Sequence, residues 1–329
     1  MRSRITGFVF VALFALVASA CGGEDAATHF KLSHKNSQPA GITTGPDGHL
    51  WFTQFSGGRI ARISTAGKID EYPIPTDRAG PFDITTGPDG NLWFTEFSAD
   101  KIARITPAGE ITEFPLGHDG GPYGITAGPD GNLWFALQKT NKIARMTVDG
   151  QITEFPIPYK GPQQPKPWGV AVGKDGNIWF TMQGLSKIGR MTLTGEITEW
   201  AVEDKAGPAD ITLGPDGNIW FTEVYAGKIG RITPDGQVSE FPVGHKKSSP
   251  KGITAGPDGN VWFTDVGRNR IGRITPAGEV EDYAIGGGYR QVQGIAAGAD
   301  GHLWFTETHA NSVSRYELPS SDAKAKNKG

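Results

Sequence analysis

Residues 124–155, GITAGPDGNLWFALQKTNKIARMTVDGQITEF, contain the motif that decides the fold. Turn sequences divide this stretch into four short runs with high β-propensity. The Gly-Pro-Asp-Gly sequence at 128–131 suits a type I turn, because proline presets φ and glycine fits the last position. The stretch therefore predicts four short antiparallel strands.

The same motif occurs seven times along the chain of 329 residues. Its Trp-Phe pair recurs at intervals of 42, 41, 45, 41, 42 and 42 residues, starting at Trp51 and ending at Trp304. Four strands in a unit of about 40–45 residues are typical of a β-propeller blade. Solenoid repeats fit less well, because their units carry a helix or a single strand, and no stretch after Cys21 has sustained helical periodicity. We therefore predict an all-β fold, a seven-bladed β-propeller of four-stranded blades.

The ends of the repeat region predict how the ring closes. The seventh unit ends after a third strand near Tyr316, whereas the segment 29–32, His-Phe-Lys-Leu, stands alone before the first unit. An N-terminal strand would complete blade seven and remove an open edge. We expect residues 29–319 to form one propeller domain and residues 320–329 to form a disordered tail.

The N-terminus has the pattern of an export signal. Arg2 and Arg4 precede an apolar run that ends in small residues at position 20, which predicts a signal peptide over 1–20. The end of this run, followed by Cys21, resembles a bacterial lipobox, and the resemblance implies cleavage before Cys21 and a lipid on its thiol. An unmodified thiol after ordinary secretion is the alternative. We expect a lipid-anchored protein of the bacterial cell envelope, facing the periplasm or the exterior, with residues 21–28 as its tether.

Composition and charge exclude several classes of function. The chain has 32 basic and 35 acidic residues and a net charge of −3, without a basic stripe, so nucleic-acid binding is not expected. A single cysteine excludes a disulfide framework and a multi-thiolate metal site. We expect a monomer that contacts the membrane through its lipid and takes a small polar or cyclic peptide ligand.

Blade geometry predicts where that ligand binds. Because the strands are antiparallel, the first strand of each blade begins at the same rim at which the second strand ends. These positions vary between units, whereas the opposite turns are nearly uniform, which favours a site at the variable rim. The second strands end at Gln54, Glu96, Leu137, Met182, Glu223, Asp265 and Glu307. The first strands begin near Ala40, Phe82 with Asp83, Tyr123, Trp168, Ala209 with Asp210, Lys251 and Gln293.

Aromatic and acidic residues at this rim predict a ligand pocket. Phe82, Tyr123 and Trp168 would form aromatic platforms, and Asp83 and Asp210 replace a glycine that most units have. Glu96, Glu223 and Asp265 would add carboxylates around the mouth. The alternative is a solvated acidic rim with ordinary turn residues.

The repeat units resemble those of the virginiamycin B lyase (streptogramin lyase) family. The resemblance rests on Gly-Pro-Asp-Gly-Asn-Leu-Trp-Phe-Thr-Glu, Lys-Ile-Ala-Arg-Ile-Thr and Glu-Ile-Thr-Glu-Phe-Pro, and it covers all seven units. It implies a magnesium-assisted elimination that opens a cyclic depsipeptide at its ester. Such a reaction needs a base for the proton next to the carbonyl and a cation for the developing negative charge.

The same resemblance assigns roles to four positions of this sequence. The substrate-binding histidine entering blade six falls on Lys251, and the Glu-x-His segment entering blade seven falls on Gln291 and Gln293. The metal-binding glutamate after the Trp-Phe strand of blade seven is present as Glu307. Glutamine is a weak neutral ligand and cannot accept a proton near neutral pH. Lys251 would need a lowered pKa to act as a base, and the acidic rim is expected to oppose this.

We therefore favour a ligand-binding or functionally diverged protein, and three other functions stay open. The first is an active lyase that uses Mg²⁺, Glu307 as metal ligand and His309 as catalytic base, since His309 lies two residues beyond Glu307. The second is a lactone hydrolase similar to the gluconolactonase group of propellers. The third is a scaffold for envelope proteins or glycans, suggested by the rim aromatics.

Overall fold

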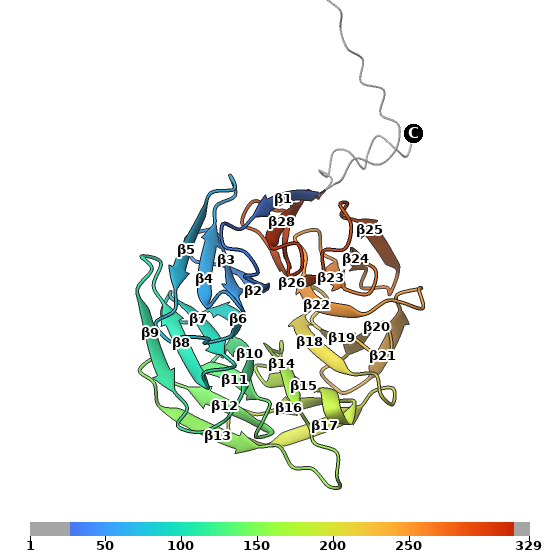
Figure 1. Ribbon diagram of the computed structural model, residues 1–329. Helices are drawn as coiled ribbons and strands as arrows, with labels where there is room; N and C mark the ends of the chain where they lie inside the picture. Colours follow the sequence, from blue (N-terminus) through green and yellow to red (C-terminus); the bar gives the residue numbers. More distant parts are fainter. Residues whose placement is uncertain (1–26, 319–329) are drawn as a thin grey trace, which may run out of the picture.

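The computed structural model describes residues 27–318 and shows seven four-stranded antiparallel sheets arranged radially in a ring (Figure 1). The predicted all-β propeller is confirmed. A short 3-10 helix, η1 (Gln183–Leu185), is the only helical segment within the described range. Accordingly, no helix between residues 27 and 318 is long and apolar enough to span a bilayer.

Six blades are built from consecutive strands. Blades 1 to 3 contain β2 (Pro39–Thr44), β3 (Leu50–Gln54), β4 (Arg59–Ile63), β5 (Ile69–Pro73), β6 (Pro81–Thr86), β7 (Leu92–Glu96), β8 (Lys101–Ile105), β9 (Ile111–Pro115), β10 (Pro122–Ala127), β11 (Leu133–Leu137), β12 (Lys142–Met146) and β13 (Ile152–Pro156). Blades 4 to 6 contain β14 (Pro167–Val172), β15 (Ile178–Met182), β16 (Lys187–Met191), β17 (Ile197–Ala201), β18 (Pro208–Leu213), β19 (Ile219–Glu223), β20 (Lys228–Ile232), β21 (Val238–Pro242), β22 (Pro250–Ala255), β23 (Val261–Asp265), β24 (Arg270–Ile274) and β25 (Val280–Ala284).

Blade 7 is closed by the N-terminal strand, as predicted. It contains β26 (Val292–Ala297), β27 (Leu303–Glu307), β28 (Ser312–Tyr316) and β1 (Ala27–Lys31), which lies antiparallel beside β28 at the outer edge (Figure 1). The strand begins at Ala27 rather than at the expected position 29, because Ala27 pairs with Tyr316 and is buried in the core cluster that contains Trp262. The predicted signal peptide, Cys21 and the tail at 320–329 lie outside the described residues.

The Trp-Phe pairs pack between neighbouring blades. Trp51 of blade 1, for example, belongs to one buried cluster with Leu92 and Phe94 of blade 2. Each of the seven tryptophans donates its indole N–H to the aspartate four residues earlier, as Trp51 does to Asp47 at 3.0 Å. The turn aspartates therefore hold the blade core in place.

A β-bulge in the first strand of every blade positions the residues at the channel. In blade 2, Pro81 pairs with Glu96 and Ile84 pairs with Phe94, so Phe82 and Asp83 both lie opposite Thr95. The same register shift occurs in the other six blades. We call these two residues of each blade the bulge residues. A bulge of this kind redirects side chains, and here it places them at the centre of the ring.

Threonine hydroxyls join the bulges of neighbouring blades. Thr95 accepts a hydrogen bond from the backbone N–H of Asp83 (3.1 Å) and donates one to the carbonyl oxygen of Tyr123 in the next blade (2.8 Å). Five other blades repeat this bridge through Thr53, Thr181, Thr222, Thr264 and Thr306. Blade 3 has Ala136 at this position, so its bridge is missing.

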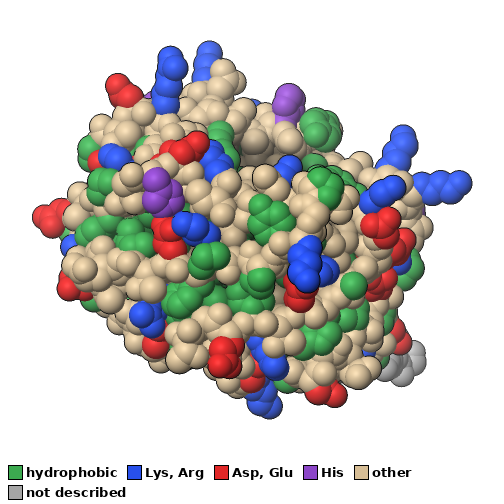
Figure 2. All heavy atoms as spheres, turned by 90° about the horizontal axis from the view of Figure 1, so that it is seen from below, with side chains coloured by type: hydrophobic (Ala, Val, Ile, Leu, Met, Phe, Trp, Pro, Cys, Tyr) green, Lys and Arg blue, Asp and Glu red, His purple; other side chains and the backbone are tan. Residues whose placement is uncertain are grey.

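The side of the disc carries charges of both signs. Figure 2 shows basic and acidic side chains interspersed with apolar patches on the face that it presents. Pairs between the third and fourth strands of one blade, such as Lys187 with Glu199 at 2.5 Å, contribute to this pattern.

Candidate functional site

A pocket lies at the centre of the ring, where the first strands of all seven blades meet. We call it the central pocket. Its lining includes eight residues that the sequence places at the start of these strands: Ala40, Phe82, Asp83, Tyr123, Trp168, Asp210, Lys251 and Gln293. Ala209 was expected at the same rim but is fully buried. The bulge of each blade therefore supplies the wall of the pocket.

Five blades have glycine at the second bulge position because neighbouring first strands approach closely there. A Cβ atom at Gly252 would lie 2.3 Å from the carbonyl oxygen of Gln293, and one at Gly124 would lie 2.5 Å from that of Trp168. Real Cβ atoms do not approach backbone atoms so closely. Blades 2 and 5 nevertheless hold Asp83 and Asp210 at this position, so these two blades accept side chains that the other five exclude.

The two aspartates are fixed by backbone hydrogen bonds from two blades each. Asp83 accepts the N–H of Ile84 in its own strand and that of Ile125 in blade 3, both at 2.9 Å. Asp210 makes the same pair of contacts in blades 5 and 6, at 2.9 and 3.0 Å. Each carboxylate therefore joins two blades and has a fixed orientation at the pocket.

Burial raises the pKa values of Asp83 and Asp210 toward neutrality. Burial, with added repulsion from Asp210, raises the pKa of Asp83 to about 7. Burial raises the pKa of Asp210 to about 6, while the backbone donors and the ammonium group of Lys251 oppose the shift. The pocket therefore changes its charge within the physiological pH range.

Three aromatic rings form a continuous wall on one side of the pocket. The ring centroids of Phe82 and Tyr123 are 3.8 Å apart, and those of Tyr123 and Trp168 are 4.3 Å apart. The rings come from blades 2, 3 and 4 and lie side by side around the mouth. We call Phe82, Tyr123 and Trp168 the aromatic arc. Its rings suit contact with an apolar or planar ligand group.

Lys251 extends from blade 6 toward the aromatic arc. Its Nζ atom lies 5.7 Å from the ring centroid of Trp168, within cation–π distance. Burial lowers the pKa of Lys251, although Asp210 acts in the opposite direction. The acidic rim opposes the shift as expected, but the desolvation of a largely enclosed ammonium group outweighs the attraction of the carboxylate.

The residues that end the second strands do not line the central pocket. All seven, including Glu96, Glu223, Asp265 and Glu307, are at most 1 % exposed. They do lie at the predicted rim, since Glu96 pairs with Pro81 and Glu307 with Val292 at the beginning of their first strands. Their side chains, however, are enclosed within the blades' packing. Of the six carboxylates predicted for this rim, only Asp83 and Asp210 line the pocket.

Glu96 and Glu223 are buried without a hydrogen-bond partner for either carboxylate oxygen. Burial, with repulsion from Glu113 in blade 2 and Glu240 in blade 5, raises the pKa of each to about 8. Both are therefore mainly protonated at neutral pH and act as neutral polar groups.

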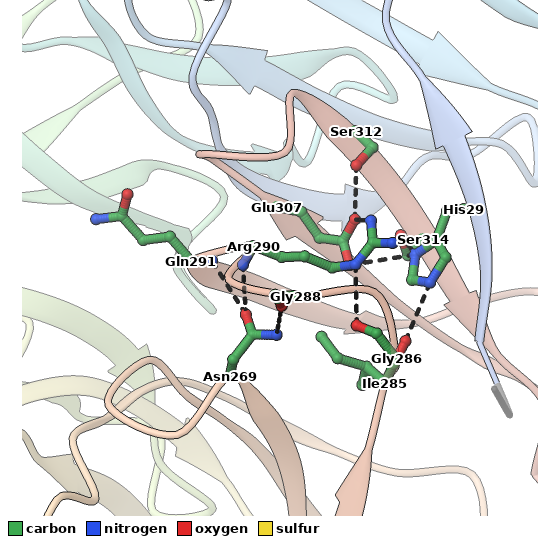
Figure 3. A network of polar contacts seen from close by, with 10 residues as sticks. All are labelled: His29, Asn269, Ile285, Gly286, Gly288, Arg290, Gln291, Glu307, Ser312 and Ser314. Atoms are coloured by element: carbon green, nitrogen blue, oxygen red, sulfur yellow. Dashed lines mark hydrogen bonds and ion pairs between the residues drawn. The ribbon is translucent and has the colours of Figure 1, made fainter. Parts of the chain in front are cut away.

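Glu307 in blade 7 occupies the strand position that Glu96 and Glu223 have in their blades, but its neighbours are hydrogen-bond donors and a basic residue (Figure 3). Its Oε2 atom accepts hydrogen bonds from Arg290 Nη1 (3.1 Å) and Ser312 Oγ (2.6 Å). His29 Nδ1 lies 3.2 Å from Oε1 and also contacts Ser314 Oγ at 2.8 Å. Although burial acts to raise it, these hydrogen bonds and nearby charges leave the pKa of Glu307 below its ordinary value. Glu307 is therefore an ionised carboxylate with its counter-ion already in place.

The residues around Glu307 do not fit a magnesium ion, which needs several available oxygen ligands. The carboxylate is engaged by Arg290, the amide of Gln291 points away from it (Figure 3), and Gln293 lines the central pocket instead. In the part of the chain that the structure describes, no three His, Cys, Asp or Glu side chains are grouped to hold a metal ion. His309 is exposed and packs on Tyr289, with ring centroids 5.4 Å apart.

Sequence reasoning missed Arg290, His29 and Ser312 as partners of Glu307. His29 lies in β1, 285 residues from its hydrogen-bond partner Ser314, so no local sequence pattern could connect the two. One signal in the sequence indicated a basic partner of Glu307, namely that Arg290 directly precedes Gln291.

Comparisons with known proteins agree with the fold. The sequence model described as the virginiamycin B lyase family matches residues 19–163 and 161–324. A streptogramin B lyase structure is 37% identical, with a TM-score of 0.85, covering 90% of this chain and 100% of its own. Virginiamycin B lyase from Staphylococcus aureus is 38% identical, with a TM-score of 0.84, covering 89% of this chain and 99% of its own. A catalytically inactive histidine-to-alanine variant of that protein, in a structure with quinupristin, gives the same values. No curated protein matches this sequence significantly.

Proposed function

This chain belongs to the virginiamycin B lyase family, and we propose that it binds a small polar or cyclic ligand at the central pocket without opening it by elimination. The fold and the position of the pocket support ligand binding in the manner of the family. The Glu-x-His segment that the family resemblance assigns to catalysis is replaced here by Gln291 and Gln293, and the substrate-binding histidine is replaced by Lys251.

The observation that carries the proposal is the ion pair between Glu307 and Arg290. A metal-assisted elimination would require the carboxylate of Glu307 to bind the cation, but that carboxylate is fully buried and accepts hydrogen bonds from Arg290 and Ser312. A divalent ion would have to displace a guanidinium group that is only 15% exposed. Removing one partner of such a buried pair is strongly unfavourable.

The replacement of the base that the family resemblance implies supports the same proposal. Gln293 cannot accept a proton near neutral pH, and His309 is not among the contacts of Glu307. Lys251 has a lowered pKa, but it lies against Trp168 at the aromatic arc. The central pocket keeps the features that binding requires, namely an aromatic wall and a few fixed polar groups.

The test is incubation of the purified chain with quinupristin and Mg²⁺, followed by liquid chromatography and mass spectrometry. Elimination opens the ring without changing the mass, whereas hydrolysis adds one water, so chromatographic mobility and mass together separate a lyase from a lactone hydrolase. We expect neither product. Ring opening that Glu307→Ala abolishes would overturn the proposal and favour an active lyase.

We further propose that the protein is held in the bacterial cell envelope through a lipid on Cys21. The support is the signal-peptide pattern and the small residues before the single cysteine. Within the described residues the first strand, β1, begins at Ala27 on the outer edge of blade 7, six positions beyond Cys21.

A further inference from the structure

We infer that the central pocket selects an organic cation, an ammonium or guanidinium group carried on an apolar or aromatic body. This inference rests on the proposed ligand-binding function and names the chemical class of the ligand. The juxtaposition that carries it is the aromatic arc facing two carboxylates, with a lysine of the chain already placed on one aromatic ring.

The pocket already binds one cation, which belongs to the protein itself. The ammonium group of Lys251 lies 5.7 Å from the ring centroid of Trp168, although Lys251 and Trp168 come from blades 6 and 4. A cation enclosed against a tryptophan face is stabilised by the quadrupole of the ring. Lys251 therefore places an amino group against this wall, although its enclosure lowers its pKa.

The two carboxylates give the pocket more negative charge than Lys251 neutralises. With Asp83 and Asp210 ionised, two negative charges face one positive charge at the mouth. Each carboxylate oxygen accepts only one backbone N–H, so each keeps capacity for a further donor. The other five blades have glycine at this position, so a carboxylate here is particular to blades 2 and 5. A cationic ligand would supply both the missing charge and the missing donors.

Other ligand classes match the pocket less well. An anion would be repelled by the carboxylates, and a metal ion would find only two acidic side chains in the lining, whereas it needs several oxygen ligands. A neutral ring compound would stack on the aromatic arc but would gain nothing from Asp83 or Asp210. The combination of an aromatic wall with carboxylates is the chemistry that recognises organic cations.

The experiment is isothermal titration calorimetry of the full chain at pH 8, where both aspartates are mainly ionised. The probes are benzylammonium, which carries N–H donors, neutral benzyl alcohol and anionic benzoate, all of which have the same ring. We expect binding of the cation, with affinity at least about tenfold above the other two probes. Asp210→Asn should weaken the binding of the cation by about tenfold.

Lys251→Met gives the sharper test, because it removes the resident cation without touching the carboxylates. We expect it to strengthen binding of benzylammonium by about tenfold, since the face of Trp168 becomes free and the negative charge is no longer balanced. Lys160→Met and Asp119→Asn, at exposed positions that do not line the pocket, are the matched controls and should leave the affinity unchanged. Lys251→Gln serves as the second variant if the methionine variant does not fold.

The outcomes separate this inference from the proposed function. Equal binding of benzyl alcohol and the cation, or unchanged cation affinity in Lys251→Met and Lys251→Gln, would overturn the cation assignment while leaving a ligand-binding protein. Absence of binding by the cation would also overturn it. Ring opening of quinupristin would instead overturn the proposed function, and it would not alter the probe affinities measured here.

Discussion

Replacing Arg290 by methionine should destabilise the protein in a strongly pH-dependent way. The substitution keeps much of the side-chain volume but leaves the carboxylate of Glu307, which is fully buried, without its guanidinium partner. It also removes the hydrogen bond from Arg290 Nε to the carbonyl oxygen of Gly286 (3.1 Å). Breaking a buried ion pair by removing one partner costs about 3–5 kcal/mol.

Two other buried glutamates of this chain indicate how large the loss of stability should be. Glu96 and Glu223 occupy the same strand position without an arginine, and their pKa values stand at about 8 instead of 4.5. Keeping such a carboxyl ionised in the folded state costs about 5 kcal/mol at alkaline pH. His29 and Ser312 remain beside Glu307 in the variant, so we expect about 3 kcal/mol at pH 8.

The sign of the pH dependence follows from the two pKa shifts. In the wild type the pKa of Glu307 is lowered, so its contribution to stability is present above 4.5 and is lost as the pH falls through the folded-state value. In Arg290→Met the folded-state pKa should rise above 4.5. The loss of stability should then be small near pH 4.5 and grow until the pH passes the raised value.

The assay is thermal and urea unfolding of wild type and Arg290→Met between pH 5 and pH 8. At about 2 °C per kcal/mol, the Tm should fall by roughly 6 °C at pH 8 and by much less at pH 5. Lys187→Met, which breaks the partly exposed pair with Glu199, is the matched control and should cost less than about 1 kcal/mol. The double variant with Glu307→Gln should recover most of the loss. A loss that is equal at both pH values would refute the reasoning.

Three further predictions follow from other parts of the molecule. Ala136→Thr should stabilise the protein by about 1 kcal/mol in urea unfolding, because the new hydroxyl restores the bridge that six other blades make; a destabilised variant would contradict this. Glu96→Gln should raise the Tm at pH 9 but not at pH 4.5, because the raised pKa of Glu96 makes its ionisation unfavourable to folding only as the pH rises. An equal gain in Tm at both pH values would count against the raised pKa. Cys21→Ser should abolish incorporation of labelled fatty acid into the expressed protein, and undiminished labelling would exclude this anchor.

The fold could be predicted because each blade repeats the same local chemistry. The Trp-Phe pairs and the Asp-Gly turns that precede them fix four strands per unit without reference to distant residues. Two features were sufficient to predict that an N-terminal strand closes the ring in blade 7: the lone strand before the first unit and the missing strand after Tyr316. The residues that line the central pocket could also be predicted, because they stand at one position of a repeating unit.

The electrostatics of the second-strand residues could not be predicted from sequence. Glu96 and Glu307 occupy equivalent positions, yet one is protonated and the other ionised at neutral pH. The difference comes from residues outside their own strands: Arg290 precedes the first strand of blade 7, and His29 lies at the other end of the chain. A repeat pattern indicates which residues are equivalent, but it does not show which charged neighbour each of them meets.

The closure of blade 7 by β1 has a consequence for the order in which the protein matures. Blades 1 to 6 each use one continuous piece of chain, so each can assemble as soon as that piece has emerged during synthesis or export. Blade 7 must wait until Tyr316 is available, and the first strand made is then the last to dock. Until that moment β28 presents an unpaired edge, and Glu307 lacks the imidazole of His29. A circular permutant that begins at β26 and carries the present N-terminus after β28 would remove this delay, because all four strands of blade 7 would then be consecutive.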